Sequence, residues 1–360
     1  GQGGAGGTGG NNLAPKQFLS EWDLFTDIRN QVPAEGVIPF GVTSPLFTDY
    51  ALKHRFVTLR EGGQIEYSQD ERWQSPVGTI YVKTFAYPID MRDPELGEQL
   101  IETRIMVHQP DGWKTWAYAY NEEMTDAELK LGGLTLSVSW INEAGEVVTV
   151  PNYGIPSTGA CRKCHGAAPN TRTLGPSTGM LNRPDDYGEG PVNQIDYFAS
   201  LGMLNNPPPP ESPENPRITY VDPAPHNAEC DPNDWLCLHD GARSWFDSNC
   251  SQCHAPNGEV ADKLLFLDWS NMNPIVTDTT HWGVCKVPTS AGNGVDCTQR
   301  YDIYPGDPDR SLLVCRIESL TAGEMMPPLG RSTVQVQGVQ VIRDWIAKMD
   351  TSDPRFAPCD

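Results

Sequence analysis

The spacing C-x-x-C-H occurs twice in this chain, in ACRKCHG at 160–166 and in NCSQCHA at 249–255. Two thiols at this spacing can add to the two vinyl groups of one haem, and the adjacent histidine then lies beneath the iron as a proximal ligand. The two copies therefore predict two covalently attached haem c groups. The attachment and ligand residues are Cys161, Cys164 and His165 in the first motif and Cys250, Cys253 and His254 in the second.

Two other chemistries also use paired cysteines. A zinc site built from both C-x-x-C pairs would not require a histidine after each pair. A thioredoxin-type dithiol is typical of a βαβ unit, and the sequence predicts no such unit around either motif. Haem attachment is the interpretation that uses all six residues.

The segments that flank the second motif predict helices. Residues 240–249 have helical apolar spacing and run directly into the motif, and residues 333–349 place an apolar stripe on one helical face. An irregular loop between them leads to GEMMPPLGR at 323–331. The stripe consists of Val339, Ile342, Trp345 and Ile346.

This order of elements resembles a class I cytochrome c, in which a methionine before proline supplies the sixth iron ligand from the opposite face. Met326 directly precedes two prolines and is the predicted sixth ligand of the second haem, with Met325 as the alternative. A methionine that only fills the core is the commoner case in general. Two adjacent methionines before two prolines, downstream of a haem histidine, favour the ligand.

The first motif has too few residues between His165 and the proline-rich stretch at 205–216 for a second complete cytochrome c. Met180, in GPSTGMLNR, is the predicted sixth ligand of the first haem, and an open sixth position is the other outcome. Three further candidates fit strand or helix packing better than ligation: Met203, His54 and His108.

Composition and periodicity predict a multidomain α+β chain. Strand patterns of period two at 54–60, 78–87, 100–109, 113–121, 134–140 and 147–153 indicate a mostly antiparallel β unit, a sandwich or a distorted barrel. INEAGE at 141–146 predicts a hairpin turn between the last two strands, and the apolar spacing of 16–25 predicts a short helix before the first. The C-terminal part is expected to be all-α and similar to a class I cytochrome c. The predicted parts are a flexible Gly-rich tether over 1–14, a β-rich domain over 15–150, a first haem-attachment segment over 151–206 packed on that domain, a Pro-rich linker over 207–216, and a cytochrome c-like domain over 217–360.

Charge and hydropathy restrict the partners. The chain has 26 basic and 47 acidic side chains, a formal net charge of −21. This surface disfavours nucleic acid and anionic lipid and favours redox partner proteins with basic docking surfaces. An uninterrupted apolar run of membrane-spanning length does not occur in the sequence. Because the first residue is Gly1, the numbering is expected to begin after processing, and a membrane tether of the precursor stays open.

Six of the ten cysteines belong to neither motif. Such a number favours disulfides in an oxidising compartment, the periplasm or the cell exterior. Closure of short loops suggests the pairs Cys230–Cys237 and Cys285–Cys297. Cys315 and Cys359 remain and would tie the terminal tail back to the domain, although six cysteines allow fifteen arrangements.

The chain resembles a family of largely uncharacterised dihaem c-type cytochromes that Gram-negative bacteria export. The matching stretches are SPLFTDYALKHRFV, PVGTIYVKTFAY, IETRIMV, GWKTWAYAYNEEMTDAEL, CRKCHG, NCSQCH, PGDPDRSLL and MMPPLGR…VIRDWI. The resemblance implies two covalent haems and an exported protein, and it supplies no substrate.

Three functions are compatible with these features. The first is an electron carrier that transfers single electrons between redox partners. The alternative is a haem enzyme of peroxidase or oxygenase type, with one open-coordinate haem. The third is a binding module in which the β unit holds a partner or a small ligand. The expected methionine ligand favours the electron carrier over a catalyst.

Overall fold

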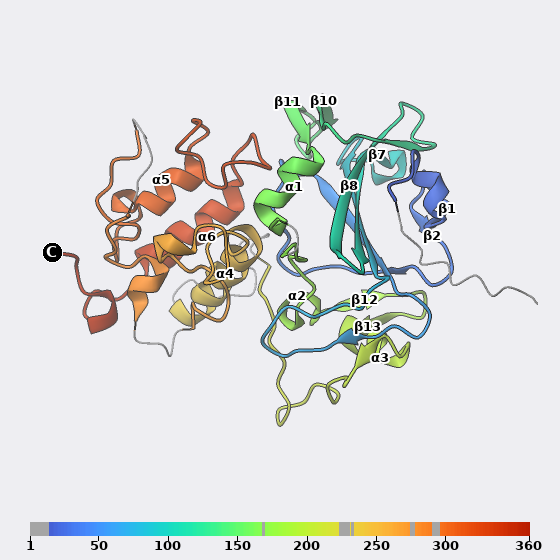
Figure 1. Ribbon diagram of the computed structural model, residues 1–360. Helices are drawn as coiled ribbons and strands as arrows, with labels where there is room; N and C mark the ends of the chain where they lie inside the picture. The colour runs from blue at the N-terminus through green and yellow to red at the C-terminus, as the bar shows by residue number, and fades with distance from the viewer. Residues whose placement is uncertain (1–13, 168–169, 223–230, 232–233, 274–277, 290–295) are drawn as a thin grey trace, which may run out of the picture.

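The computed structural model describes residues 14–167, 170–222, 231, 234–273, 278–289 and 296–360. It is a mixed α+β structure with an antiparallel β-sheet region toward the N-terminus and a mostly helical region toward the C-terminus (Figure 1). The predicted α+β class is confirmed at this level. The predicted tether over 1–14 lies almost entirely outside the described residues.

The main sheet has six antiparallel strands in the order β3-β4-β6-β7-β8-β9. It is open, because β3 and β9 are its edge strands, so the expected barrel is not formed. Each predicted strand is found, with both ends within two residues of the expected positions. The bounds are β3 Ile38–Pro39, β4 Leu52–Thr58, β6 Ile80–Pro88, β7 Glu98–Gln109, β8 Gly112–Tyr120 and β9 Ala127–Leu129.

The two faces of the sheet differ in chemistry. Apolar residues that are paired across four strands form one face: Phe56, Val82, Ile105 and Trp116. Leu19 and Trp22, from the short 3-10 helix Leu19–Trp22, belong to the same buried cluster. Because successive residues of a strand point to opposite faces, the preceding or following residues form the other face: Arg55, Lys83, Arg104 and Ala117.

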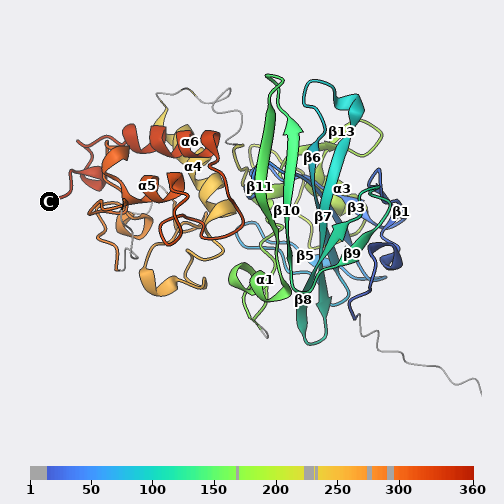
Figure 2. The same ribbon diagram turned by 90° about the horizontal axis from the view of Figure 1, so that it is seen from above.

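Part of this second face is covered by a two-stranded hairpin, β10 (Leu134–Ile141) and β11 (Val147–Ile155). Trp140 stacks on Tyr87 with ring centroids 4.6 Å apart, and Val138, Val150 and Tyr153 join the same cluster. The predicted turn at 141–146 closes this hairpin. A hairpin therefore takes the place of the second sheet that a sandwich would require (Figure 2).

The segment after the hairpin begins between the sheet and the helical region and then continues below the sheet in the view of Figure 1. It contains α1 (Thr158–His165), α2 (Thr178–Leu181), the strand pair β12 (Pro184–Asp186) and β13 (Pro191–Asn193), and α3 (Gln194–Ser200). Leu181, Ile195 and Phe198 lie in one buried cluster with Val57 and Trp73 of the sheet region. The proline-rich stretch then folds back on α3, because Arg217 Nη2 donates to Asp196 Oδ1 and to the Pro209 carbonyl, each at 2.7 Å.

Three helices form the C-terminal core: α4 (Trp235–Asn249), α5 (Leu312–Glu318) and α6 (Val336–Ala347). The predicted stripe on the last helix is confirmed, since all four of its residues are buried. At Gly338, a Cβ atom would lie 2.3 Å from Trp245 Nε1, so glycine permits the close approach of α6 to α4.

The remaining short elements are β1 Phe25–Asp27, β2 Val32–Pro33, β5 Ile65–Glu66, β14 Leu204–Asn205, and 3-10 turns Pro94–Leu96, Ala261–Lys263, Thr279–Trp282, Pro308–Arg310 and Pro354–Phe356.

The helix expected over 16–25 is largely absent. Only Leu19–Trp22 is helical, as a 3-10 turn, and β1 begins at Phe25. Asp23, which follows the turn, has a positive φ of 53° that ends the helix. The apolar residues of this segment pack on the sheet, and a single helical turn is enough to place them there.

The loop 44–50 connects the sheet region to the helical region. Asp49 is buried, and its carboxylate accepts hydrogen bonds from the backbone and side chains of Ser332 and Thr333 at 2.7–2.9 Å. Phe47 N donates to Asn249 Oδ1 at 2.8 Å. The chain just before α6 and the last residue of α4 are thereby held by the same loop.

The disulfides differ from two of the predicted pairs. Cys285 is bonded to Cys359 and Cys297 to Cys315, with Cα–Cα distances of 5.2 and 5.6 Å. The predictions Cys285–Cys297 and Cys315–Cys359 are therefore wrong, because they followed sequence proximity. Packing of Phe356 in the helical core brings the chain end beside Cys285. The predicted pair Cys230–Cys237 involves a residue outside the described part.

These two disulfides indicate an oxidising compartment. Among the described residues, no helix has the length and apolarity needed to cross a membrane.

The pH dependence of stability can be predicted from His239, which is buried in the helical core. Its Nε2 donates to the Met272 carbonyl and its Nδ1 accepts from Trp345 Nε1; burial lowers its pKa to about 3. The unfolded chain binds a proton that the folded chain excludes, so stability is present above pH 6.5 and is lost as the pH falls. We expect this residue to contribute about 1.4 kcal/mol per pH unit between pH 6 and 4. Urea unfolding at several pH values measures the slope. An unchanged slope in His239→Gln would contradict this assignment.

Candidate functional site

The first motif forms α1, directly after the hairpin. Ser157 caps this helix, since its side chain accepts from Ala160 N at 3.2 Å. Cys161 and Cys164 are both free thiols and are half-buried. The motif thus lies between the sheet region and the helical region (Figure 2).

His165, the last residue of α1, has one ring nitrogen engaged. Its Nδ1 donates to the Arg172 carbonyl at 2.9 Å, which leaves Nε2 as the unprotonated nitrogen. Burial lowers the pKa of this histidine to about 4, so it is neutral near pH 7. A neutral imidazole that is oriented by a carbonyl through its other nitrogen is the usual state of a metal-ligating histidine.

A cavity of about 220 Å³ separates the first motif from the sheet. We call it the sheet cavity. All three functional residues of the first motif line it, together with apolar residues from three segments and basic residues from the sheet. The lining includes Cys161, Cys164, His165, Phe40, Val42, Leu174, Met180, Arg55, Lys83 and Arg104.

Met180 lies at this cavity, on the short helix α2. Its sulfur would be 2.8 Å from a Cβ atom on Gly175, so glycine leaves room for the thioether. The other candidates lie elsewhere: Met203 packs in the cluster around Phe198, His54 contacts Glu98 at 2.5 Å, and His108 bonds the Ser75 carbonyl. The structure therefore brings Met180, and none of these three, to the sheet cavity.

The second motif begins where α4 ends. Cys250 caps the helix, with its N–H donating to the Phe246 carbonyl at 2.7 Å, and Cys250 and Cys253 are free thiols. Burial lowers the pKa of His254. Its Nδ1 is buried and faces the Leu265 carbonyl without a well-formed hydrogen bond. This neutral imidazole, with a buried unpartnered nitrogen, also fits a role as ligand.

Met326 is held in place by Arg331, whose Nη2 donates to the Met326 carbonyl at 2.9 Å. It lines a cavity of about 10 Å³ with Phe47, Trp245, Asn249 and other residues, and that lining does not include His254. Met325 is half-buried beside it. The methionine loop thus reaches the end of α4, next to the second motif, but the structure does not place Met326 and His254 in one cavity.

The two motifs contact each other. Cys253 Sγ lies 3.7 Å from the Lys163 carbonyl oxygen, although these residues are far apart in the sequence. Arg172 strengthens the contact, because its guanidinium donates to the Gln252 carbonyl at 3.1 Å and to the Asn257 carbonyl at 2.7 Å. One residue therefore orients His165 through its backbone and holds the second motif through its side chain.

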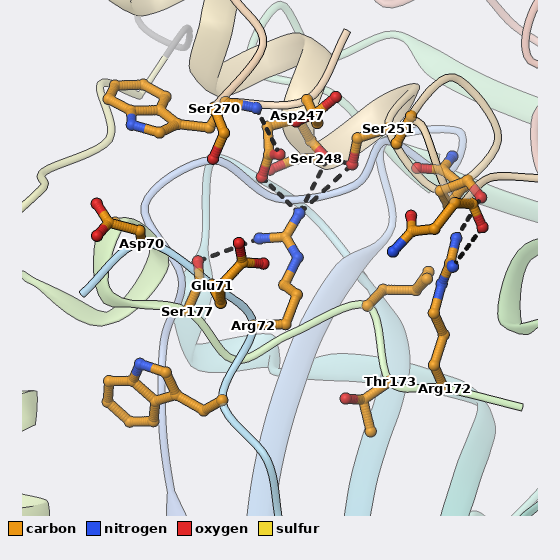
Figure 3. A pocket seen from close by; sticks show the side chains of 18 of the residues that line it. Asp70, Glu71, Arg72, Arg172, Thr173, Ser177, Asp247, Ser248, Ser251 and Ser270 are labelled. Carbon is orange, nitrogen blue, oxygen red and sulfur yellow. Dashed lines mark hydrogen bonds and ion pairs between the residues drawn. The ribbon is translucent and has the colours of Figure 1, made fainter. Parts of the chain in front are cut away.

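A second cavity, of about 460 Å³, adjoins the sheet cavity and is called the junction cavity (Figure 3). Thr173, Leu174 and Ser248 line both. Its lining comes mainly from four separate segments, around residues 69–75, 171–179, 247–257 and 268–271.

Arg72 crosses the junction cavity between these segments. Its Nη2 lies 2.6 Å from the buried Asp247 carboxylate on α4, and its Nη1 donates to Ser177 Oγ at 3.1 Å (Figure 3). Tyr220 OH donates to the same Asp247 oxygen at 2.6 Å. Burial opposes the charge of Arg72, but Asp247 and Tyr220 together raise its pKa. Arg72 therefore keeps its positive charge, and the carboxylate of Asp247 balances it.

Burial keeps three motif cysteines, Cys164, Cys250 and Cys253, protonated. It raises the pKa of the Cys164 and Cys250 thiols and raises that of Cys253 to about 11. A thiol-disulfide catalyst or a zinc ligand needs the thiolate. Within the described residues, no group of three or more His, Cys, Asp or Glu side chains is arranged to hold a metal ion.

Sequence reasoning missed Arg72, Arg172 and the basic face of the sheet. Arg72 directly follows two acidic residues in a polar stretch, and Arg172 lies in a loop without a recognisable pattern. The basic residues did leave a signal, because each interrupts an otherwise apolar or aromatic strand, but their alignment depends on strand register.

No protein-family model, no curated protein and no solved structure gives a significant match to this chain.

Breaking the Arg72–Asp247 pair should destabilise the protein strongly. In Arg72→Met, the buried carboxylate loses its cation, so we expect the free energy of unfolding to fall by about 3 kcal/mol. Arg343→Ala is the matched control, because its partners Asp309 and Glu318 are exposed, and it should cost less than about 1 kcal/mol. Urea unfolding measures both. Equal losses in the two variants would contradict the role assigned to Arg72.

Proposed function

We propose that this protein is a dihaem c-type cytochrome that transfers single electrons between redox partners. The observation that carries the proposal is the contact between the two C-x-x-C-H motifs, with Cys253 Sγ 3.7 Å from the Lys163 carbonyl. Anchoring points on adjoining segments suit a relay, because electron transfer requires cofactors to be held close together. Each haem iron would supply the one-electron chemistry.

The residues of both motifs fit covalent attachment. Cys161 and Cys164, like Cys250 and Cys253, are free and thus available for thioether bonds, whereas Cys285, Cys297, Cys315 and Cys359 are consumed in disulfides. His165 and His254 are half-buried, and the lowered pKa of each keeps its imidazole neutral, which suits an iron ligand. Arg172 acts as a positioning residue, since its carbonyl fixes the ring of His165.

The helical region supports a likeness to class I cytochrome c. A helix runs into the second motif, a methionine loop follows, and α6 crosses α4 at Gly338. In this proposal Met326 binds the second iron and Met180 the first. The wider resemblance to exported dihaem cytochromes of Gram-negative bacteria fits the two disulfides and the formal net charge of −21, which suits basic redox partners.

Maturation in a cell that attaches haem c should add the mass of two haems to the chain. Cys250→Ser should lose a covalent attachment at the second motif only, and Cys161→Ser at the first motif only. Intact-mass and peptide mass spectrometry measure both. Release of all haem into acidic acetone would contradict covalent attachment.

The assignment of Met326 predicts a spectroscopic signature. The oxidised protein should show the weak near-infrared absorption of a methionine–ferric haem, and Met326→Ala should abolish the contribution of the second haem and lower its potential, because a thioether favours the ferrous state. Met325→Ala is the matched control and should leave both unchanged. The reverse pattern would assign the ligand to Met325.

A haem enzyme is the second candidate, and the junction cavity is the observation in its favour. This cavity of about 460 Å³ is lined by polar and charged groups, adjoins the sheet cavity and has Met180 near its wall, with Arg72 Nη1 3.9 Å from the sulfur. Such a space could admit a small polar substrate toward the first motif.

Carbon monoxide separates the two candidates. If Met180 closes the sixth position of the first iron, the reduced protein should bind no carbon monoxide at neutral pH, and Met180→Ala should create one binding site per chain. Absorption spectroscopy measures the stoichiometry. Binding of one equivalent by the unaltered protein, together with peroxide turnover, would support the enzyme instead.

A further inference from the structure

Three basic side chains stand side by side on the sheet where it faces the first motif. Arg55 on β4 pairs with Lys83 on β6, and Lys83 pairs with Arg104 on β7. All three line the sheet cavity together with Cys161, Cys164 and His165. Adjacent strands are roughly 4.8 Å apart, so the row spans about 10 Å across the cavity. We call Arg55, Lys83 and Arg104 the basic row.

Only one member of the basic row has a carboxylate partner among the described residues. Arg104 makes two hydrogen bonds to Glu102, at 2.6 and 2.9 Å, and Glu102 is fully buried. Arg55 Nη1 donates to the Lys53 carbonyl at 3.1 Å, and the Lys83 ammonium lies 5.5 Å from the centre of the Phe85 ring. Two positive charges of the row are therefore not matched by an anion.

Unmatched charge in a cavity with apolar walls is costly, because buried charges need a partner. Burial accordingly lowers the pKa of Lys83 to about 7 and that of Arg55 to about 10, with further lowering of Lys83 by Arg55 and Arg104. Phe40, Val42, Leu174 and Met180 supply apolar surface in the same cavity. The cavity thus combines an apolar wall, two surplus cations and two thiols, and a ligand should complement all three.

We propose that the basic row binds the two propionate carboxylates of the haem attached at the first motif, with Arg55 and Lys83 as their cations. This inference rests on the proposed function, and it assigns an orientation to that haem. The helix α1, which carries the thiols, contacts β8. Arg104 lies on the neighbouring strand β7, and Arg55 lies on β4, two strands farther from α1. The carboxylate edge therefore faces inward against the sheet, away from the thioether edge.

The number of charges also agrees. A haem carries two carboxylates, and the basic row has two cations without a carboxylate partner. A free dicarboxylate would satisfy the same charges, but it would leave the apolar wall and the thiols without a function. Haem and a free dicarboxylate both offer a pair of carboxylates, so the experiment must distinguish between these two ligands.

The test uses matured, full-length protein and the variant Lys83→Met. Removing a cation beside the propionates disfavours reduction, so the midpoint potential of the first haem should become more negative while that of the second changes little. Redox-difference infrared spectroscopy should show shifted carboxylate bands. Lys114→Met is the matched control: Lys114 lies on β8 of the same sheet and has the same charge, but it pairs with Asp111 at 2.7 Å and does not line the sheet cavity. We expect its shift to be several-fold smaller.

Each remaining outcome is informative. Loss of the first haem in Lys83→Met, with retention in Lys83→Arg, would support the requirement for a cation at this position. Equal potential shifts in Lys83→Met and Lys114→Met, or no change in the carboxylate bands, would overturn the proposal while mass spectrometry still shows two haems. If the unaltered chain carries no haem at the first motif, the proposed function itself fails. Calorimetric binding of succinate to that haem-free chain, lost in Lys83→Met, would assign the row to a free dicarboxylate.

Discussion

The ion pair between Arg72 and Asp247 is the contact on which the arrangement of the site depends. Arg72 belongs to the sheet region and Asp247 to the last turn of α4, three residues before Cys250. The same guanidinium donates to Ser177, in the segment that follows the first motif. A charge pair of this kind contributes little net stability when compared with apolar packing, but it is costly to break. It therefore fixes how three separate segments meet.

Around this pair, the two motifs are held by backbone groups more than by side chains. The carbonyl of Arg172 orients His165, the carbonyl of Lys163 meets Cys253, and the carbonyls of Gln252 and Asn257 accept from the Arg172 guanidinium. Carbonyl positions are set by the course of the chain. The position of the two motifs relative to each other is thus set by the fold. The loop 44–50 contributes to this, because Asp49 fixes the chain just before α6.

One face of the sheet packs in an apolar core, and the other carries basic side chains that line a cavity. Phe56, Val82 and Ile105 pack against the N-terminal segment, whereas their neighbours Arg55, Lys83 and Arg104 face a cavity. Such a face is unstable alone, since it exposes cations to an apolar space, and this is the physical reason to expect a permanent anionic occupant. The hairpin β10–β11 covers the rest of the face, so that the sheet cavity is confined to the region beside α1.

Local patterns in the sequence were sufficient for the two motifs, the strands, the hairpin turn and the buried stripe of α6, because period two, period 3.6 and C-x-x-C-H are all read within about fifteen residues. Tertiary structure alone decided the contact between the motifs, the basic row and the junction cavity, since each joins residues from distant segments. It also decided the disulfides: Cys297 pairs with Cys315 because α5 lies beside it, and Cys285 with Cys359 because Phe356 anchors the chain end in the core. Sequence separation carries no information on such proximity.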